Sequence, residues 1–329
     1  MSFRRRTLSL PYPLIAITHN GVRVMFAYVL RRLARAVVTV FAVVTAVFFL
    51  ERLNGNPAAI MLSNTATPKQ IATLSKALGF DRPLSVQYLS FVKGLLHGNF
   101  GTSLQSGTPA LQLVLGRLPA TLLLVLTGFI FGVALAMFCV LAIQLTGSHA
   151  LRNGLLVAGQ VRQAIPMFVF GVLLVLAFSV TLHWFPSQGE GSWKNLVLPA
   201  LTVGTFEFAL YLRFMDASFG EQSHQDYVRT AYAKGNAPHG VVLRHELRNV
   251  LLPILTIIGF NLGGLLGGSV IIETVFNWPG IGQLTVESVN TRDFPVVQAS
   301  LLVASLAFVL VNIAVDLIYS VVDPRVRIR

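Results

Sequence analysis

Charged residues are scarce in this chain. Asp, Glu, Lys and Arg together make up 12% of its 329 residues, about half the share found in an ordinary soluble domain. Only 13 residues are acidic, and the 15 prolines and 27 glycines are too few for a disordered or collagen-like chain. These shortages exclude an ordinary cytosolic enzyme. The single cysteine, Cys139, excludes an intramolecular disulfide.

Motifs for catalysis and nucleotide binding are also missing. The sequence contains no Gly-x-x-x-x-Gly-Lys-Ser/Thr loop, no Gly-x-Ser-x-Gly elbow and no His-Glu-x-x-His pair. The seven histidines are scattered, and His239 and His245 are spaced so that they share a helix face poorly. We therefore expect no catalytic residue, no metal site and no cofactor on this chain, so that any ATP is bound by a partner.

Long apolar runs dominate what is present. Hydrophobic residues make up 54% of the sequence, and the mean hydropathy is +0.70. A transmembrane helix needs about 20 mostly apolar residues to cross roughly 30 Å of hydrocarbon. The sequence predicts an all-α, polytopic membrane protein with six transmembrane helices, at about residues 33–50, 118–143, 155–182, 196–212, 251–272 and 296–322.

The distribution of basic residues predicts the orientation. Lys and Arg exceed Asp and Glu by a formal charge of +12, and most of them fall in the segments that lie inside when the N-terminus is inside; Arg152 and Arg162 are counted there. Short cytoplasmic loops retain positive charge, so we expect both termini in the cytoplasm. This explains the positive charge without a nucleic-acid partner.

The long outer loop, about 52–117, contains two capped helical patterns. They are residues 69–78, ending at Gly79, and residues 84–96, ending at Gly98, and they predict an outer helical cap.

Three features inside the predicted spans are candidates for function. Ionisable residues there are costly and often functional. Glu207 either lines an aqueous pathway or faces a polar group on a neighbouring span, and Asp316 either has a similar role or simply pairs with a buried donor or interfacial water. Gly259, Gly263 and Gly267 allow close helix contact, within this subunit or with a second one.

The inner loop between the fourth and fifth spans contains a short predicted helix. Asp226 is a suitable N-cap, and Gly235 is a suitable left-handed stop. Val228, Ala231 and Tyr232 would share one face. So short a helix is marginal alone, so it must pack on this protein or in a groove of a partner. Pro238 then opens a further helix.

This loop resembles the cytoplasmic signature of bacterial ABC-importer permeases. Arg229-Thr230-Ala231, followed by three residues and Gly235, matches the family spacing, and its first two residues resemble those of the peptide-importer branch. Other segments resemble the dipeptide, oligopeptide, glutathione and nickel permeases: residues 78–84, 98–103, 248–253, 273–282, 292–298 and 323–325. The resemblance covers residues 25–329, so we expect residues 1–24 to be a disordered extension outside the folded domain.

The resemblance implies a type I permease bundle in the bacterial inner membrane. It implies the first of two paralogous permease subunits, with a second permease, two ATPases that bind ATP and Mg²⁺, an extracytoplasmic binding protein and membrane lipid as partners. The inner loop, about 213–250, would couple to an ATPase through Asp226, Tyr227, Arg229, Thr230, Ala231, Lys234 and Gly235. The pathway or outer gate would involve Glu207, Glu273, Trp278, Pro279 and Gly280.

The resemblance leaves the substrate open. Dipeptides, longer peptides, glutathione and nickel complexes all remain candidates. A different class of protein, an ion-coupled secondary transporter with an ion site at Glu207 or Asp316, would be favoured by inverted repeats or broken mid-membrane helices. The sequence shows neither.

Overall fold

A computed structural model describes residues 34, 37–50, 52, 58–59, 62 and 66–322, without the side chains of residue 260 and of residues 316–322. The expectations for residues 1–24, for the Asp316 side chain and for the final motif at 323–325 therefore lie outside the described part. Within that part the chain is helical and has no β-strand, only an isolated bridge between Thr102 and Pro109.

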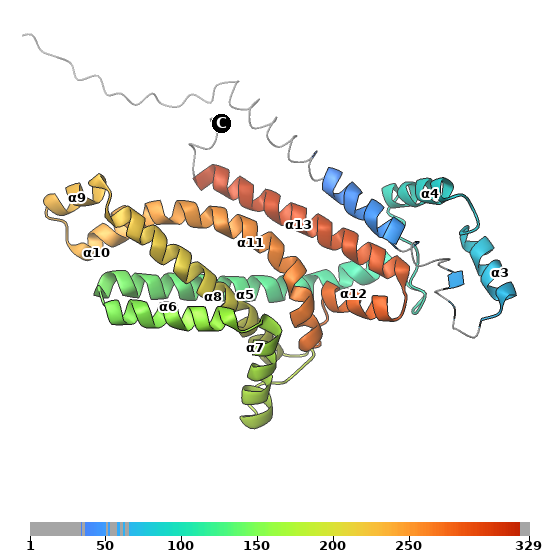
Figure 1. Cartoon of the computed structure of the whole chain (residues 1–329), viewed down its shortest axis with the longest axis horizontal. Helices are drawn as coiled ribbons and strands as arrows, with labels where there is room; N and C mark the ends of the chain where they lie inside the picture. The colour runs from blue at the N-terminus through green and yellow to red at the C-terminus, as the bar shows by residue number, and fades with distance from the viewer. Residues whose placement is uncertain are drawn as a thin grey trace, which may run out of the picture.

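From residue 68 onward, the helices follow one another along the chain, with the longest connections between them at residues 97–109 and 182–192 (Figure 1). Those of the outer loop are α3 (Pro68–Leu78) and α4 (Leu84–Leu96). The remaining elements are α5 (Ala110–Thr146), α6 (His149–Ala164), α7 (Met167–Leu174), the π-helix η1 (Val175–Thr181), α8 (Trp193–Ser223), α9 (Asp226–Ala233), α10 (Pro238–Val241), the π-helix η2 (Val242–Glu246), α11 (Leu247–Val275), α12 (Ile281–Asn290) and α13 (Phe294–Val322).

The predicted inner and outer helices lie at opposite ends of the bundle. In Figure 1, α9 and α10 are at one end of the long helices, and α3 and α4 are at the other. The caps of α3 agree with the sequence: Thr67 and Gln70 form a capping box, and Gly79 ends the helix with φ 73°. Gly98, shortly after α4, also has positive φ. The two helices predicted for the outer loop are thus confirmed.

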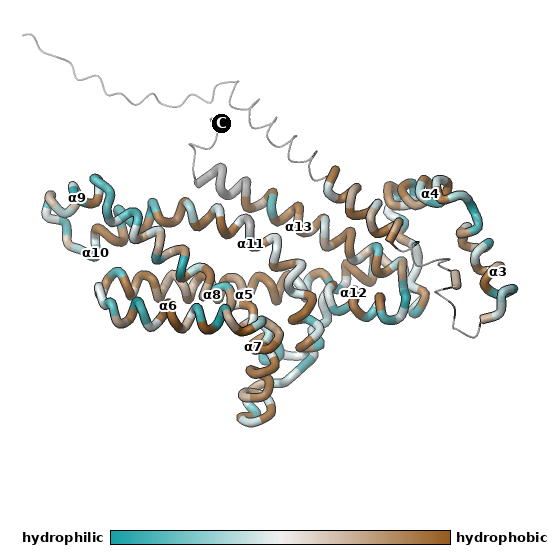
Figure 2. Tube along the Cα trace, in the orientation of Figure 1, coloured by the Kyte–Doolittle hydropathy of each residue, from teal (hydrophilic) through white to brown (hydrophobic). Residues whose placement is uncertain are grey.

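Three helices are long and apolar enough to cross a membrane without a break: α5, α8, and α13 over Phe294–Val315. Apolar residues predominate along α5, α7, α11 and α13, while polar residues gather around α9 (Figure 2). Two bent helix pairs raise the number of candidate spans among the described residues to five. The first expected span is represented by Val37–Leu50, a shorter apolar helix.

The third expected span, 155–182, is not a single helix. The chain bends by 101° between His149–Ala164 and Met167–Thr181, so α7 projects away from the bundle (Figure 1). The physical cause is Pro166, which lacks an N–H and disfavours helical geometry at the preceding residue. Ile165 accordingly adopts an extended conformation, with φ −87° and ψ 121°. The fifth expected span is also bent, by 45° between Pro238–Gly259 and Asn261–Val275.

Glycines bring α5 and α8 into close contact. A Cβ atom added at Gly132 would collide with the backbone oxygen of Gly204 and lie 2.7 Å from Cβ of Glu207. A Cβ atom at Gly128 would lie 2.7 Å from Cβ of Val203. We call Gly128, Gly132 and Gly204 the glycine seam. Because these residues have no side chains, the two helices approach closely enough to bury Glu207 between them.

We predict that Gly132→Ala destabilises the folded chain. Alanine favours a helix over glycine by up to about 1 kcal/mol, but the added methyl group would force α5 and α8 apart, at a cost of about 1–3 kcal/mol. Thermal unfolding in detergent should therefore show a lower Tm. Gly116→Ala is the matched control. Gly116 lies on the same helix, and a Cβ atom added there would meet nothing within 4 Å. Equal Tm shifts for both variants would contradict the seam.

Candidate coupling, outer and mid-bundle sites

The predicted coupling helix is present as α9, with one correction at its start. Its N-cap is Gln225, with φ −76° and ψ 150°, and Asp226 is the first helical residue. An acidic side chain in the first turn still interacts favourably with the helix dipole. Gly235 has φ 76°, the left-handed conformation that the sequence predicts. Helix α9 is therefore followed by a position at which glycine is strongly preferred.

The buried face of α9 differs from the predicted one. Val228 and Ala231 are buried against Val241 of α10, with Tyr227 packed beside them. The Tyr227 hydroxyl donates a hydrogen bond to Gln222 over 2.8 Å. Tyr232 is 45% exposed, because the buried face is centred between Tyr227, Val228 and Ala231 and position 232 falls at its edge.

The opposite face of α9 is open in this chain. Arg229, Thr230, Tyr232 and Lys234 are all exposed. Arg229 lies 3.7 Å from the Asp226 carboxylate, and both side chains are largely in solvent. One face of the helix is thus fixed on its own subunit while the other presents hydroxyl and basic groups outward.

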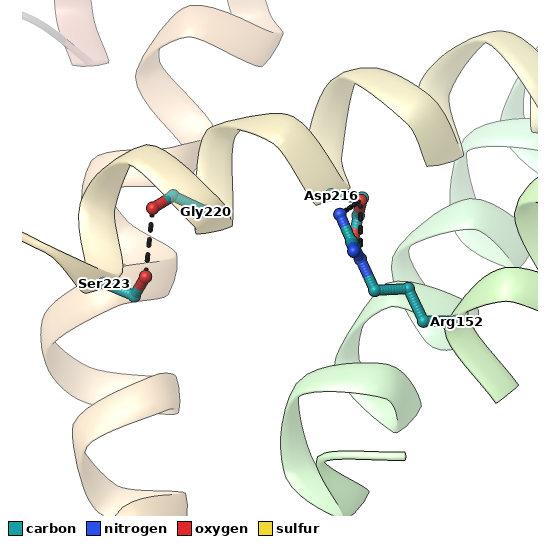
Figure 3. Close-up of polar contacts among 4 residues, drawn as sticks. All are labelled: Arg152, Asp216, Gly220 and Ser223. Atoms are coloured by element: carbon teal, nitrogen blue, oxygen red, sulfur yellow. Dashed lines mark hydrogen bonds and ion pairs between the residues drawn. The ribbon is translucent and has the colours of Figure 1, made fainter. Parts of the chain in front are cut away.

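An ion pair joins α6 to α8 near this loop (Figure 3). Arg152 donates from Nε to Asp216 Oδ1 over 2.9 Å and from Nη2 to Oδ2 over 2.8 Å. The Asp216 side chain is 6% exposed, and nearby the Ser223 hydroxyl donates to the Gly220 carbonyl over 3.0 Å. In the sequence, Arg152 counts only as one of the basic residues that predict the orientation, and no role is predicted for Asp216. The signal in the sequence that could have identified Asp216 is an acidic residue at the end of an apolar run.

Arg162 also differs from its prediction. It was expected among the cytoplasmic charges, but it is buried at the α6–α7 bend. Its guanidinium donates to the Thr205 hydroxyl and to the Thr202 carbonyl, each over 2.9 Å. It also lies 3.9 Å from the centroid of the Phe170 ring. Arg162 therefore connects the bend to α8.

Glu273 organises the outer motif. Its carboxylate is fully buried, and Oε1 accepts hydrogen bonds from the hydroxyls of Thr121 (2.8 Å) and Ser269 (3.1 Å). Oε2 accepts from the backbone N–H groups of Gly282 (2.7 Å) and Gln283 (3.1 Å). These N–H groups belong to the first turn of α12, where a negative charge is favourable. Glu273 thus caps a helix that follows it in sequence.

The rest of this motif is buried around the carboxylate. A Cβ atom at Gly280 would collide with Glu273, which explains the glycine although its backbone is extended. Trp278, a candidate for the pathway or outer gate, is 5% exposed, and its Nε1 donates to the Ala120 carbonyl over 2.9 Å. Its indole N–H needs a partner inside the fold. Pro279 is buried next to it.

A second buried carboxylate joins two other motifs. Asp293 accepts hydrogen bonds from the Ser103 hydroxyl and, over 3.1 Å, from the Leu104 N–H. Gly101 makes close contact with Pro295 nearby, since an added Cβ would lie 3.3 Å from the proline Cβ. Segments 98–103 and 292–298, distant in sequence, are therefore brought together beside α12.

The structure separates the remaining candidates. Glu207 is 2% exposed, and its Cβ atom faces Gly132 of α5. Gly259 and Gly263 face α13, where added Cβ atoms would lie within 2.6 Å of Val315 and 2.9 Å of Phe308. Gly267 is exposed, with nothing within 4 Å of an added Cβ. In the part of the chain that is described, no group of three or more His, Cys, Asp or Glu residues is arranged to hold a metal ion.

We predict that Glu273→Gln loosens α12. The amide loses the negative charge that accepts four hydrogen bonds, and hydrogen bonds to charged groups are typically worth about 1.5–3 kcal/mol each. Backbone amides of residues 282–286 should exchange with deuterium faster, and Tm should fall. Glu287→Gln, an exposed position on the same helix, is the matched control. Unchanged exchange in Glu273→Gln would rule out the capping role.

Comparison with known proteins agrees with these features. Residues 147–328 match the family described as "Binding-protein-dependent transport system inner membrane component", and residues 25–125 match its N-terminal counterpart. The glutathione transport system permease protein GsiC of Salmonella paratyphi A is 40% identical over 307 residues, covering 92% of this chain and 99% of that protein. GsiC of Escherichia coli K12 is 38% identical with the same coverage.

The matches extend over both the outer and the inner motifs described above. They include the short inner helix α9, the α12 segment capped by Glu273 and the Ser103 segment held by Asp293. The chain therefore belongs to the binding-protein-dependent transport family, as an ABC-importer permease subunit of the peptide, glutathione and nickel branch.

Proposed function

We propose that this permease imports a small peptide or a glutathione-like substrate across the bacterial inner membrane. It would form half of the pathway, beside a second paralogous permease, with two ATPase subunits below and an extracytoplasmic binding protein above. The similarity to permeases named for glutathione transport supports a peptide-like substrate over a nickel complex. ATP and Mg²⁺ would be bound by the ATPase subunits.

The observation that carries the proposal is the arrangement of α9. One face is packed against its own subunit, and the other presents Arg229, Thr230 and Lys234 to a partner. Only two residues separate α9 from the end of α8, so a movement of α9 is passed directly to a long helix of the bundle. The Arg152–Asp216 ion pair extends that connection to α6. These features fit a helix that docks on an ATPase.

The opposite end of the bundle suits contact with a binding protein. Glu273 and Asp293 fasten α12 and the segment around Ser103 to α5 and α11. A rigid outer surface would border the path without moving independently. On this topology both termini are cytoplasmic, the cap at about 52–117 faces outward, and the loop at about 213–250 faces the ATPases.

The exposed glycine face of α11 is available for the second permease. Gly264, Gly267 and Gly268 are exposed, and added Cβ atoms there would meet nothing within 4 Å. Gly259 and Gly263 are used within the subunit, against α13. Contact within the subunit therefore accounts for Gly259 and Gly263. For Gly267 we propose contact with the second permease subunit.

Reconstitution tests the proposed function. Purified alone in liposomes, the chain should neither hydrolyse ATP nor take up substrate, because it lacks a phosphate-binding loop. Adding the second permease, the two ATPases and the loaded binding protein should give ATP-dependent uptake of glutathione or a short peptide. Uptake by the isolated chain, driven by a proton or sodium gradient, would instead support a secondary transporter.

We predict that Gly235→Val uncouples ATP hydrolysis from uptake. Valine at φ 76° costs about 1–2 kcal/mol, so the end of α9 would change its path. A Cβ at Gly235 meets nothing within 4 Å of its own chain, so insertion and folding should persist. Co-purification of the ATPases or substrate-stimulated ATP hydrolysis should be lost, with a milder effect for Gly235→Ala.

Gly240→Val is the matched control for this prediction. It places the same side chain in the same loop, at a helical position with open space and without positive φ. Coupling should survive in that variant. Normal coupling in Gly235→Val would show that this loop is not the ATPase contact.

A further inference from the structure

Two polar atoms are enclosed in the middle of the bundle without partners. Glu207 Oε2 and Tyr211 Oη are buried, and neither has a hydrogen-bond partner among the residues that the structure describes. Their side chains are 2% and 0% exposed. Leaving such groups unpaired is unfavourable in a low-dielectric interior. A buried carboxylate and a buried phenol on the same helix therefore suggest a state in which they do have a partner.

The two residues lie on one face of α8, one turn apart. The ring of Tyr211 meets the ring of Phe129 of α5 edge to face, with centroids 5.9 Å apart. Asn261 of α11 is a polar neighbour of the Tyr211 hydroxyl. A carboxylate, a phenol oxygen, an amide and two aromatic rings thus converge where α5, α8 and α11 meet.

This junction coincides with a bend. Helix α11 changes direction by 45° between Gly259 and Asn261, the residue beside Tyr211. The glycine seam holds α5 and α8 together on the other side. The Cβ atom of Glu207 packs at this seam, so movement of the Asn261–Val275 part of α11 about the bend would open the junction beside the Glu207 carboxylate and the Tyr211 hydroxyl without separating α5 from α8. Helix α8 leads to α9, so the junction is mechanically connected to the coupling helix.

We infer that Glu207 and Tyr211 form a cation subsite of the pathway, closed in this conformation, that receives the primary ammonium group of the substrate. The inference rests on the proposed import of peptide-like substrates. A carboxylate supplies the counter-charge, the phenol and Asn261 oxygens accept hydrogen bonds from the ammonium, and aromatic rings attract cations through their faces. Peptides and glutathione carry such a group.

The first experiment measures uptake by the complete complex in proteoliposomes, at saturating concentrations of loaded binding protein. Glu207→Gln should lower the uptake rate at least about tenfold, the typical effect of losing a charged hydrogen-bond partner. Assembly of the complex should be unchanged, as co-purification of the subunits would show. Glu221→Gln, an exposed glutamate on the same helix, should behave as wild type. Wild-type uptake by Glu207→Gln would overturn the inference.

A second experiment separates a pathway site from a structural one. With Cys139→Ser as background, Tyr211→Cys would be treated with thiol reagents of matched size and opposite charge. Without nucleotide, the position should react slowly. During turnover, the cationic reagent should react about tenfold faster than the anionic one, and Glu207→Gln should remove that preference. No reaction in any state, or equal reaction with both reagents during turnover, would overturn the inference.

The measurements distinguish a failure of the proposed import function from a failure of the cation subsite. If the wild-type complex shows no substrate-stimulated ATP hydrolysis or uptake, the import function itself is wrong. If the wild-type complex and Glu207→Gln both transport normally, only the cation subsite is wrong.

Tyr211→Phe provides an independent variant that keeps the ring and the packing. It should lower uptake less than Glu207→Gln, because only a neutral hydroxyl is lost. If Tyr211→Phe took up less substrate than Glu207→Gln, the assignment of the counter-charge to Glu207 would be contradicted.

Discussion

The glycine seam between α5 and α8 is the contact on which the rest of the bundle depends. Between apolar helices in a membrane, water exclusion supplies little attraction, so close van der Waals packing must hold them together. Gly128, Gly132 and Gly204 permit that approach. The hydrophobic residues of α11 and η2 then pack against the paired helices, and Arg162 attaches the α6–α7 bend to α8. The position of Glu207 follows from the same contact.

Buried polar groups give the two ends of the bundle different properties. At the end that carries α12, the carboxylate oxygens of Glu273 and Asp293 accept hydrogen bonds from backbone and hydroxyl donors of distant segments. These satisfied carboxylates favour a single arrangement. At the end that carries α9, this helix packs through Val228, Ala231 and Tyr227 on Val241, and one ion pair lies nearby. A firmly held α12 end and a lightly packed α9 fit the proposal that movements of this subunit start at α9.

Between these ends, two polar residues of α8 differ from the paired carboxylates. Among the residues that the structure describes, one oxygen of Glu207 and the hydroxyl oxygen of Tyr211 have no hydrogen-bond partner, in contrast to the carboxylates of Glu273 and Asp293. The same residue type therefore has two roles, set by its surroundings. Where donors converge, it fastens segments together; where donors are missing, next to a bend in α11, it is available for a ligand.

Sequence alone determined the membrane class, the two outer helices, the place of α9 and the left-handed Gly235, because composition, capping residues and glycine act locally. It also supplied the family, through motifs along the chain. Tertiary structure decided the 101° bend at Pro166, the burial of Trp278 and the pairing of Arg152 with Asp216. It also decided the capping of α12 by Glu273. Those features depend on which segments meet in space, and local patterns contain no information about contacts between residues so far apart.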